Sequence, residues 1–199
     1  MEIISYLLVL IFSTAIHEYM HAFTSFNLGD TTAHDHGRLS FNPLRHIDPF
    51  FSILMPAVLI LSGSGVVFGA AKPVPFNPNM VRGGKNGAAL VAISGPLSNL
   101  LIALVAGTIF KITGGDLFGN VMQQFVYLNL GFFVFNLIPF PPLDGSRVLY
   151  AFAPEPVLDV MDKIEQFGIM GVFAFLFLAY PIIGGFVSFW VDYLAKFIL

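Results

Sequence analysis

Two histidines and a glutamate stand together near the start of the chain, in the sequence His17-Glu18-Tyr19-Met20-His21. Residues four positions apart in a helix lie on one face, one turn above the other. His17 and His21 could therefore hold one metal ion between them, with Glu18 beside it. Zinc in such a site lowers the pKa of water to about 7, so a neighbouring carboxylate can take its proton during attack on a carbonyl. The spacing predicts zinc-dependent hydrolysis.

The segment that carries these groups is strongly apolar. Residues 3–16 contain no charge, and the 199-residue chain is 56% hydrophobic and only 11% charged. Soluble domains are about a quarter charged, so the composition predicts an integral membrane protein. Ionisable side chains within a membrane span cost several kcal/mol unless they are paired or bind metal. An HExxH pattern in this setting favours a metalloprotease site over a chance match.

A catalytic zinc usually takes three protein ligands, so two histidines are too few. The chain has no cysteine, which leaves His, Asp or Glu as the third ligand. Asp144 is one candidate, because it follows the fourth apolar stretch among prolines; it could equally be a turn aspartate before Gly145. In another class of membrane metalloprotease the third ligand is a downstream glutamate. Glu155 and Glu165 are available for that role, but neither lies in a matching motif.

The apolar stretches predict an all-α polytopic membrane protein with about four to six transmembrane helices. We expect one membrane-embedded metalloprotease domain over residues 1–199, with its core at 3–150 and a C-terminal span and interfacial helix at 157–199. A re-entrant segment and a short extended loop would fall within 50–78. The main helices are expected near residues 3–26, 87–110, 121–140 and 168–186.

Whether residues 50–68 cross the membrane decides whether Asp144 can reach His17 and His21 to form one metal site. If they crossed, the fourth helix would end on the opposite side from the first, and Asp144 would lie far from His21. If they enter and return, both helix ends converge. The positive-inside rule favours return, with the zinc site nearer the cytoplasmic face and the N-terminus outside. If the segment returns, only Lys111 and Lys196 lie on the outer side of the membrane. The other basic residues then share the cytoplasmic side: Arg38, Arg45, Lys72, Arg82, Lys85, Arg147 and Lys163.

Several motifs occur in one order along the chain. HEYMH at 17–21 is followed by GRLSFNPLRHIDP at 37–49, FGAAKPVPFNP at 68–78, SGPLSNL at 94–100 and NLIPFPPLDGSRVL at 136–149. In this order the chain resembles the site-2 protease family of intramembrane zinc metalloproteases, over most of residues 10–150. It is similar to the minimal form without a PDZ domain.

The resemblance implies that His17, His21 and Asp144 bind one zinc ion per chain and that Glu18 is catalytic. Asn99 and Asn136 occupy motif positions, where they would either position substrate or make interhelical hydrogen bonds. Relatives often have an aromatic residue at the position of Ala70, a departure expected to affect substrate contact and not the zinc.

The resemblance also implies partners and location. Substrates would be membrane-protein or signal-peptide-like helices, cut in or near their transmembrane segments within the cell membrane, as in regulated intramembrane proteolysis. The proline-rich residues 63–78 could bind an unwound substrate by strand addition. No basic tract of the kind that binds nucleic acid is present.

Two alternatives stay open at this point. The chain could be a non-proteolytic membrane metal-binding or transport protein, although transporters usually distribute paired polar residues over several midplane helices. His34 and His36 could form a second metal site or lie in a solvated loop.

Overall fold

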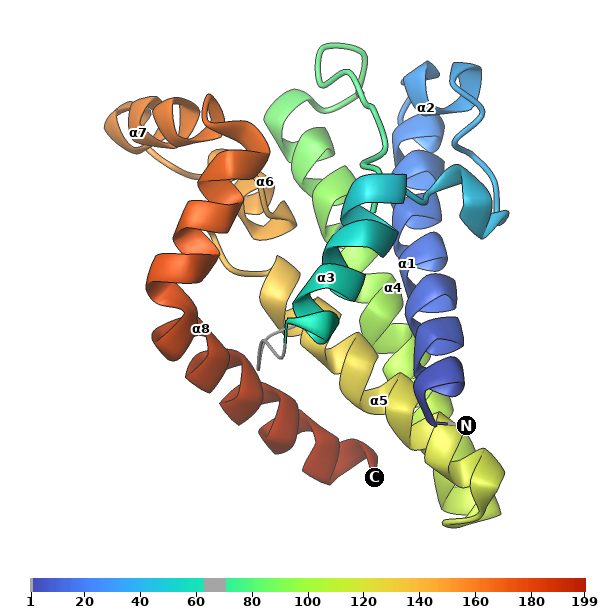
Figure 1. Ribbon diagram of the computed structural model, residues 1–199. Helices are drawn as coiled ribbons and strands as arrows, with labels where there is room; N and C mark the ends of the chain where they lie inside the picture. The colour runs from blue at the N-terminus through green and yellow to red at the C-terminus, as the bar shows by residue number, and fades with distance from the viewer. Residues whose placement is uncertain (1, 63–70) are drawn as a thin grey trace.

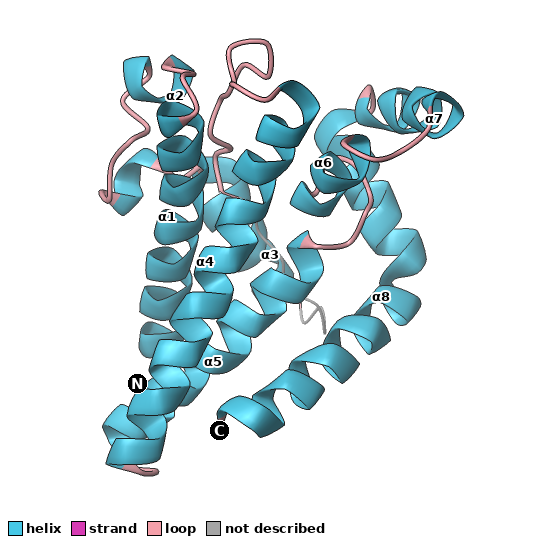
Figure 2. Cartoon of the chain, turned by 180° about the vertical axis from the view of Figure 1, so that it is seen from behind, coloured by secondary structure: helices cyan, strands magenta, loops and turns pink. Residues whose placement is uncertain are grey.

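The computed structural model describes residues 2–62 and 71–199, and within those ranges it contains helices and loops but no strand (Figures 1 and 2). The long helices are α1 (Glu2–Asn27), α4 (Gly84–Thr113), α5 (Leu117–Asn136) and α8 (Gly168–Ile198). The short helices are α2 (Thr32–Asp35), α3 (Met55–Leu61), α6 (Asp144–Tyr150) and α7 (Glu155–Glu165), with a 3-10 turn at Pro43–Arg45 and a π-helical turn at Pro49–Leu54. The all-helical prediction is confirmed for these residues.

Two helices of the described chain are long and apolar enough to cross a membrane, at Ile4–Asn27 and Gly84–Thr113. This finding fits a membrane protein. The predicted number of four to six spans stays a prediction, because the first half of α5 carries Asn120, Gln123 and Gln124 among its apolar residues.

Helices α1, α4 and α5 pack together around small side chains. The bonds from His17 to Asn99 and from His21 to Val91 show that α1 and α4 run antiparallel. Small residues on one face of α4 let its neighbours approach closely, as is usual between membrane helices. A buried cluster between α4, α5 and α8 contains Ala103, Ala106, Val126, Leu130, Val134, Val191, Ala195 and Ile198.

Helix α8 is continuous over 31 residues, where the sequence suggested a span followed by a separate interfacial helix. The reason lies in its last turns. Val191, Ala195 and Ile198 are buried against the α4–α5 cluster, so packing favours one uninterrupted helix to the end of the chain.

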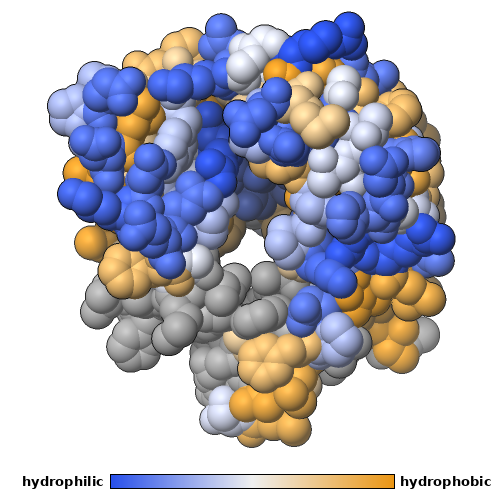
Figure 3. All heavy atoms as spheres, turned by 90° about the horizontal axis from the view of Figure 1, so that it is seen from above, coloured by the Kyte–Doolittle hydropathy of each residue, from blue (hydrophilic) through white to orange (hydrophobic). Residues whose placement is uncertain are grey.

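Helix α1 ends and α4 begins at the same end of the molecule. The backbone N–H of Arg82 donates to the carbonyl of Leu28 at 2.8 Å, and its guanidinium donates to the carbonyl of Asn27 at 2.6 Å. Seen from above, this end face is largely hydrophilic around a central hollow (Figure 3). Residues 63–70, which include Ala70 and parts of the expected re-entrant segment and extended loop, lie outside the described residues.

Candidate metal centre

Three potential ligand atoms converge between α1 and the start of α6. The Nε2 atoms of His17 and His21 are 3.0 Å apart, and they lie 3.2 and 3.3 Å from Oδ2 of Asp144. Ligands bound tetrahedrally at about 2.0–2.1 Å from a zinc ion stand about 3.3 Å from one another. The triangle therefore has the size that a zinc site requires. Within residues 2–62 and 71–199, it is the one group of three or more such side chains close enough to share an ion.

Both histidines present a proton-free nitrogen to this point. His21 Nδ1 donates to the carbonyl of Val91 at 2.8 Å, and His17 Nδ1 donates to Oδ1 of Asn99 at 2.6 Å. Because each Nδ1 holds the ring proton, each Nε2 keeps a lone pair. Oδ2 of Asp144 is shielded from solvent and has no hydrogen-bond donor among the described groups. Three lone pairs facing one another are unfavourable without a cation, so the donor set fits zinc.

A chain of buried amides fixes His17. Asn99 is fully buried and donates from Nδ2 to Oδ1 of Asn129 at 2.7 Å. Asn129 in turn donates to Oγ of Ser13 at 2.8 Å. The network crosses three helices and sets the rotation of the His17 ring. Asn99 thus contacts a proposed ligand, and the substrate-positioning role expected for it stays a prediction.

Two glycines make room for the ligands. A Cβ atom added at Gly95 would lie 2.6 Å from Cε1 of His21 and 2.8 Å from Cε1 of His17. One added at Gly145 would lie 2.7 Å from the carbonyl oxygen of Ile138. Real Cβ atoms do not approach other atoms so closely. The backbone of α4 can therefore pass against the histidines only without a side chain at residue 95, and α6 can fold back onto the end of α5 only without one at residue 145.

Asp144 is the first residue of α6, which is held in place by α7. Arg147 pairs with Glu165, and the hydroxyl of Tyr150 donates to Asp162 at 2.7 Å. Glu165 was one of the alternative third ligands, and its carboxylate is used by this ion pair. Glu155 is the first residue of α7, and it does not belong to the metal-ligating group found among the described residues.

Glu18 lies on the next position of α1, half-buried. Its Oε2 accepts a hydrogen bond from the backbone N–H of Val74 at 3.1 Å. Residues 71–77 have no regular structure, and they are further tied by bonds from Lys72 N to the carbonyl of His46 and from Asn77 N to Asp30. The segment thereby places one backbone donor on the proposed catalytic carboxylate.

The remaining predicted site residues lie elsewhere. Asn136 donates to the carbonyl of Phe132 in its own helix at 3.1 Å, and its substrate role stays a prediction. His34 is exposed and contacts Asp35, and His36 bonds to the carbonyl of Thr32. Neither histidine joins a group of three metal-ligating side chains in the part of the chain that the structure describes.

The sequence reasoning missed Gly95, Asn129 and the N–H of Val74. Gly95 and Asn99 are four residues apart on α4, so their shared face was a usable signal. Ser13 and Asn129 are polar residues in apolar stretches, which also marks interhelical contacts. The Val74 bond had no sequence signal, because a backbone group carries none.

Comparison with known proteins agrees with this geometry. The chain is 35% identical over 192 residues to "Putative zinc metalloprotease YwhC" of Bacillus subtilis, covering 89% of this chain and 82% of that protein. It is 31% identical over 187 residues to "Putative zinc metalloprotease Rip2" of Mycobacterium tuberculosis strain H37Rv, covering 90% of this chain and 69% of that protein. No family model and no solved structure matches the chain. With this identity and coverage, the chain belongs to the zinc metalloprotease family of YwhC.

Proposed function

We propose that the chain is an intramembrane zinc endopeptidase of the site-2 protease type, which hydrolyses peptide bonds in or near transmembrane segments. The observation that carries the proposal is the position of the ligands on an apolar helix. His21 and His17 precede the end of α1 at Asn27 by six and ten residues. At 1.5 Å per residue, these are depths of about 9 and 15 Å. A bilayer's hydrocarbon core is about 30 Å thick, so the centre would lie inside it.

His17, His21 and Asp144 would hold the zinc ion. When bound, zinc supplies a Lewis acid that polarises a carbonyl and acidifies water. Glu18 takes the proton of the attacking water on its carboxylate and gives it to the leaving amine. The N–H of Val74 holds that carboxylate in place, and Asn99 keeps the proton of His17 on Nδ1.

The orientation that we propose puts the metal centre nearer the cytoplasmic face. The positive-inside rule supports this orientation. The bonds between Arg82 and the end of α1 bring the two borders of residues 28–83 together, which supports their placement on one side. Lys111 lies at the other end of α4, where its Nζ is 3.4 Å from the carbonyl of Phe197. Residues 28–83 would then enter and leave the membrane on one side.

We further propose that the irregular residues 71–77 offer backbone groups to an unwound substrate. Lys72 and Val74 use their N–H groups inside the protein, and Pro73 and Pro75 have none. Along residues 72–75 the backbone can therefore offer a substrate only carbonyl acceptors. Substrates should pair with it through their own N–H groups, and proline scanning of the substrate next to the cleaved bond would reveal this as reduced cleavage.

The test is cleavage of a tagged membrane-spanning substrate by zinc-loaded enzyme in lipid vesicles. Glu18→Gln should lower the rate at least about 100-fold, since it removes the general base, while zinc content stays unchanged. Glu155→Gln, at the exposed start of α7, is the matched control and should cleave like wild type. Full cleavage by Glu18→Gln would overturn the proposal. Zinc binding with no cleavage by wild type would instead favour a metal-binding or transport role.

A further inference from the structure

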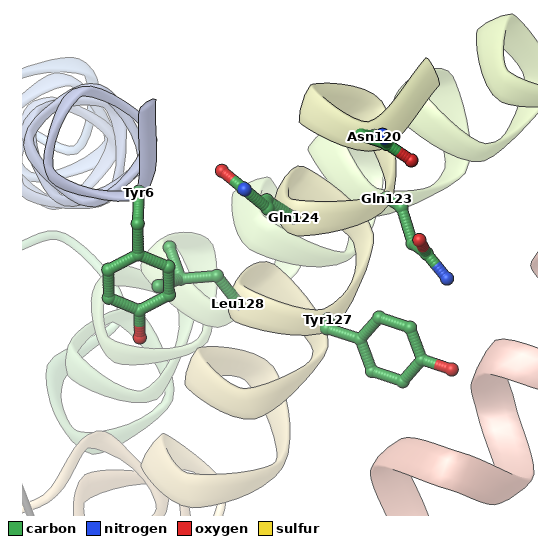
Figure 4. A pocket seen from close by; sticks show the side chains of 6 residues that line it. All are labelled: Tyr6, Asn120, Gln123, Gln124, Tyr127 and Leu128. Carbon is green, nitrogen blue, oxygen red and sulfur yellow. The ribbon is translucent and has the colours of Figure 1, made fainter. Parts of the chain in front are cut away.

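A cavity lies between the beginning of α1 and residues 120–128 of α5, away from the metal centre (Figure 4). Its volume is about 500 Å³. The side chains of Tyr6, from α1, and of Gln124 and Leu128, from α5, point into the same space in the close view. The described residues that line it are Tyr6, Asn120, Gln123, Gln124, Tyr127 and Leu128.

The polar groups of this cavity follow one face of α5. Asn120, Gln123, Gln124 and Tyr127 have the spacing i, i+3, i+4 and i+7, which aligns side chains along a helix. Gln124 is seven residues into α5, at a depth of about 10 Å. Amides at such a depth in lipid are costly, and they usually mark a site. Oε1 of Gln124 is shielded from solvent, with no hydrogen-bond donor among the residues described.

The chemistry of the lining selects a kind of ligand. Carboxamides and phenols both donate and accept hydrogen bonds. Among the described side chains of the wall, none carries a charge that would compensate a phosphate or a carboxylate. Leu128 and the two tyrosine rings add apolar area. The cavity therefore suits an uncharged polar group that is presented by an otherwise apolar molecule.

The two helices that line the cavity both continue to the metal centre. Tyr6 precedes His17 by eleven residues on α1, which corresponds to about 16 Å along the helix. On α5, Gln124 precedes Asn129 by five residues, and Asn129 belongs to the network that fixes His17. Asn129 bonds to Ser13, and Asp144 after α5 reaches His17 and His21, so α1 and α5 run parallel. A membrane helix that reached the metal centre along this path would pass the cavity.

We propose that this cavity is a second substrate-binding site, which accepts an uncharged hydrogen-bonding side chain of the transmembrane substrate. The inference rests on the proposed function and adds a substrate class to it. The preferred substrate carries Asn, Gln, Ser or Thr about 16 Å from the cleaved bond, on the side toward the start of α1. That distance corresponds to about eleven residues if the substrate stays helical, or about five if it is extended.

The test is a positional scan in lipid vesicles. A single Asn is moved along an otherwise apolar membrane-spanning substrate, and cleavage rates are compared with those of the substrate without Asn. Wild type should show a maximum between about five and eleven residues from the cleaved bond, about three- to tenfold above the apolar substrate. The double variant Gln123→Leu/Gln124→Leu should lose this maximum and keep its zinc. Gln166→Leu, an exposed site at the end of α7, should retain the maximum.

Each outcome decides the inference. A maximum that persists in the double variant would overturn it, and so would equal cleavage of all substrate positions by wild type. In both cases cleavage itself leaves the proposed function intact. If zinc-loaded wild type cleaves no substrate at all, the proposed function fails together with the inference. Zinc analysis of the double variant separates loss of the cavity from loss of the fold.

Discussion

At the residue scale, the metal centre depends on which ring nitrogen each histidine leaves free. Val91 supplies a backbone carbonyl to His21, and Asn99 supplies a side-chain oxygen to His17. A main-chain acceptor cannot be removed by substitution, but the Asn99 carboxamide can. The two histidines therefore differ in how easily their orientation is lost, with His17 the more vulnerable one.

The first prediction concerns Asn99→Ala. It should lower zinc affinity about 10- to 100-fold, because His17 loses the acceptor that holds its proton on Nδ1. Zinc titration of the purified protein measures this directly. Asn136→Ala is the matched control and should bind zinc normally, since the bond that Asn136 makes among the described residues lies within its own helix. Normal zinc affinity in Asn99→Ala with a raised KM would instead assign Asn99 to substrate binding.

At the element scale, the site requires α4 to pass very close to α1. Gly95 sits where a side chain would meet both histidine rings, so the interhelical distance depends on its missing Cβ. Gly131 on α5 offers a contrast, because a Cβ added there meets no atom of the described residues within 4 Å. The chain thus provides two helical glycines with opposite surroundings.

The second prediction uses this pair. Gly95→Ala should reduce zinc content and cleavage about 10- to 100-fold, since the ligands must move to accommodate the methyl group. Gly131→Ala should keep both and gain up to about 1 kcal/mol of helix stability. Zinc content and thermal unfolding of the two variants, compared side by side, check this. Equal zinc content in both would show that α4 does not constrain the histidines.

The loop after α1 is organised by one buried carboxylate. Asp30 is fully buried and accepts hydrogen bonds from Ser25, from the backbone N–H and hydroxyl of Thr32, and from the N–H of Asn77. Burial alone would raise the pKa of Asp30, but these bonds outweigh it and hold the pKa below its usual value. Asp30 therefore joins the irregular segment at residues 71–77 to the end of α1 in its ionised form.

The third prediction is a pH effect on stability. The folded-state pKa of Asp30 is depressed, so its contribution is complete above the unfolded pKa of about 3.9 and is lost as pH falls through the folded pKa. Asp30→Asn should lower the unfolding free energy at neutral pH by about 2 kcal/mol and flatten this acid dependence. Thermal unfolding in detergent between neutral and acidic pH measures both. Asp159→Asn, at an exposed position of α7, is the control and should change neither.

The sequence predicted the elements better than their junctions. The apolar stretches located α1, α4 and α5 closely, because a long apolar run has few other structures in a bilayer. Helical spacing in HExxH predicted that the two histidines lie together, as they do, and the catalytic role of Glu18 stays a prediction. Spacing left Asp144 ambiguous between ligand and turn residue, since its partners are over 100 positions away. The continuity of α8 depends on how Val191 and Ala195 pack, which periodicity does not report.

At the scale of the whole molecule, the proposed topology requires residues 28–83 to begin and end on one side of the membrane. The fourth prediction tests this with single cysteine substitutions. Because the natural sequence has no cysteine, each variant carries one thiol at a known position. His34→Cys and Lys85→Cys should react with an impermeant reagent from the same side, and Gly115→Cys from the opposite side. Helix α4 separates the last two positions by about 45 Å. Labelling of His34→Cys and Lys85→Cys from opposite sides would exclude a re-entrant segment.

The most direct test of the central claim is the zinc content of detergent-purified protein. Wild type should hold about one zinc ion per chain, and Asp144→Ala should lose it or bind it far more weakly, because the variant keeps only two of three ligands. Elemental analysis gives both numbers in one experiment. Equal zinc in the two proteins would contradict a centre built from His17, His21 and Asp144, and it would remove the reason for bringing α6 back to α1.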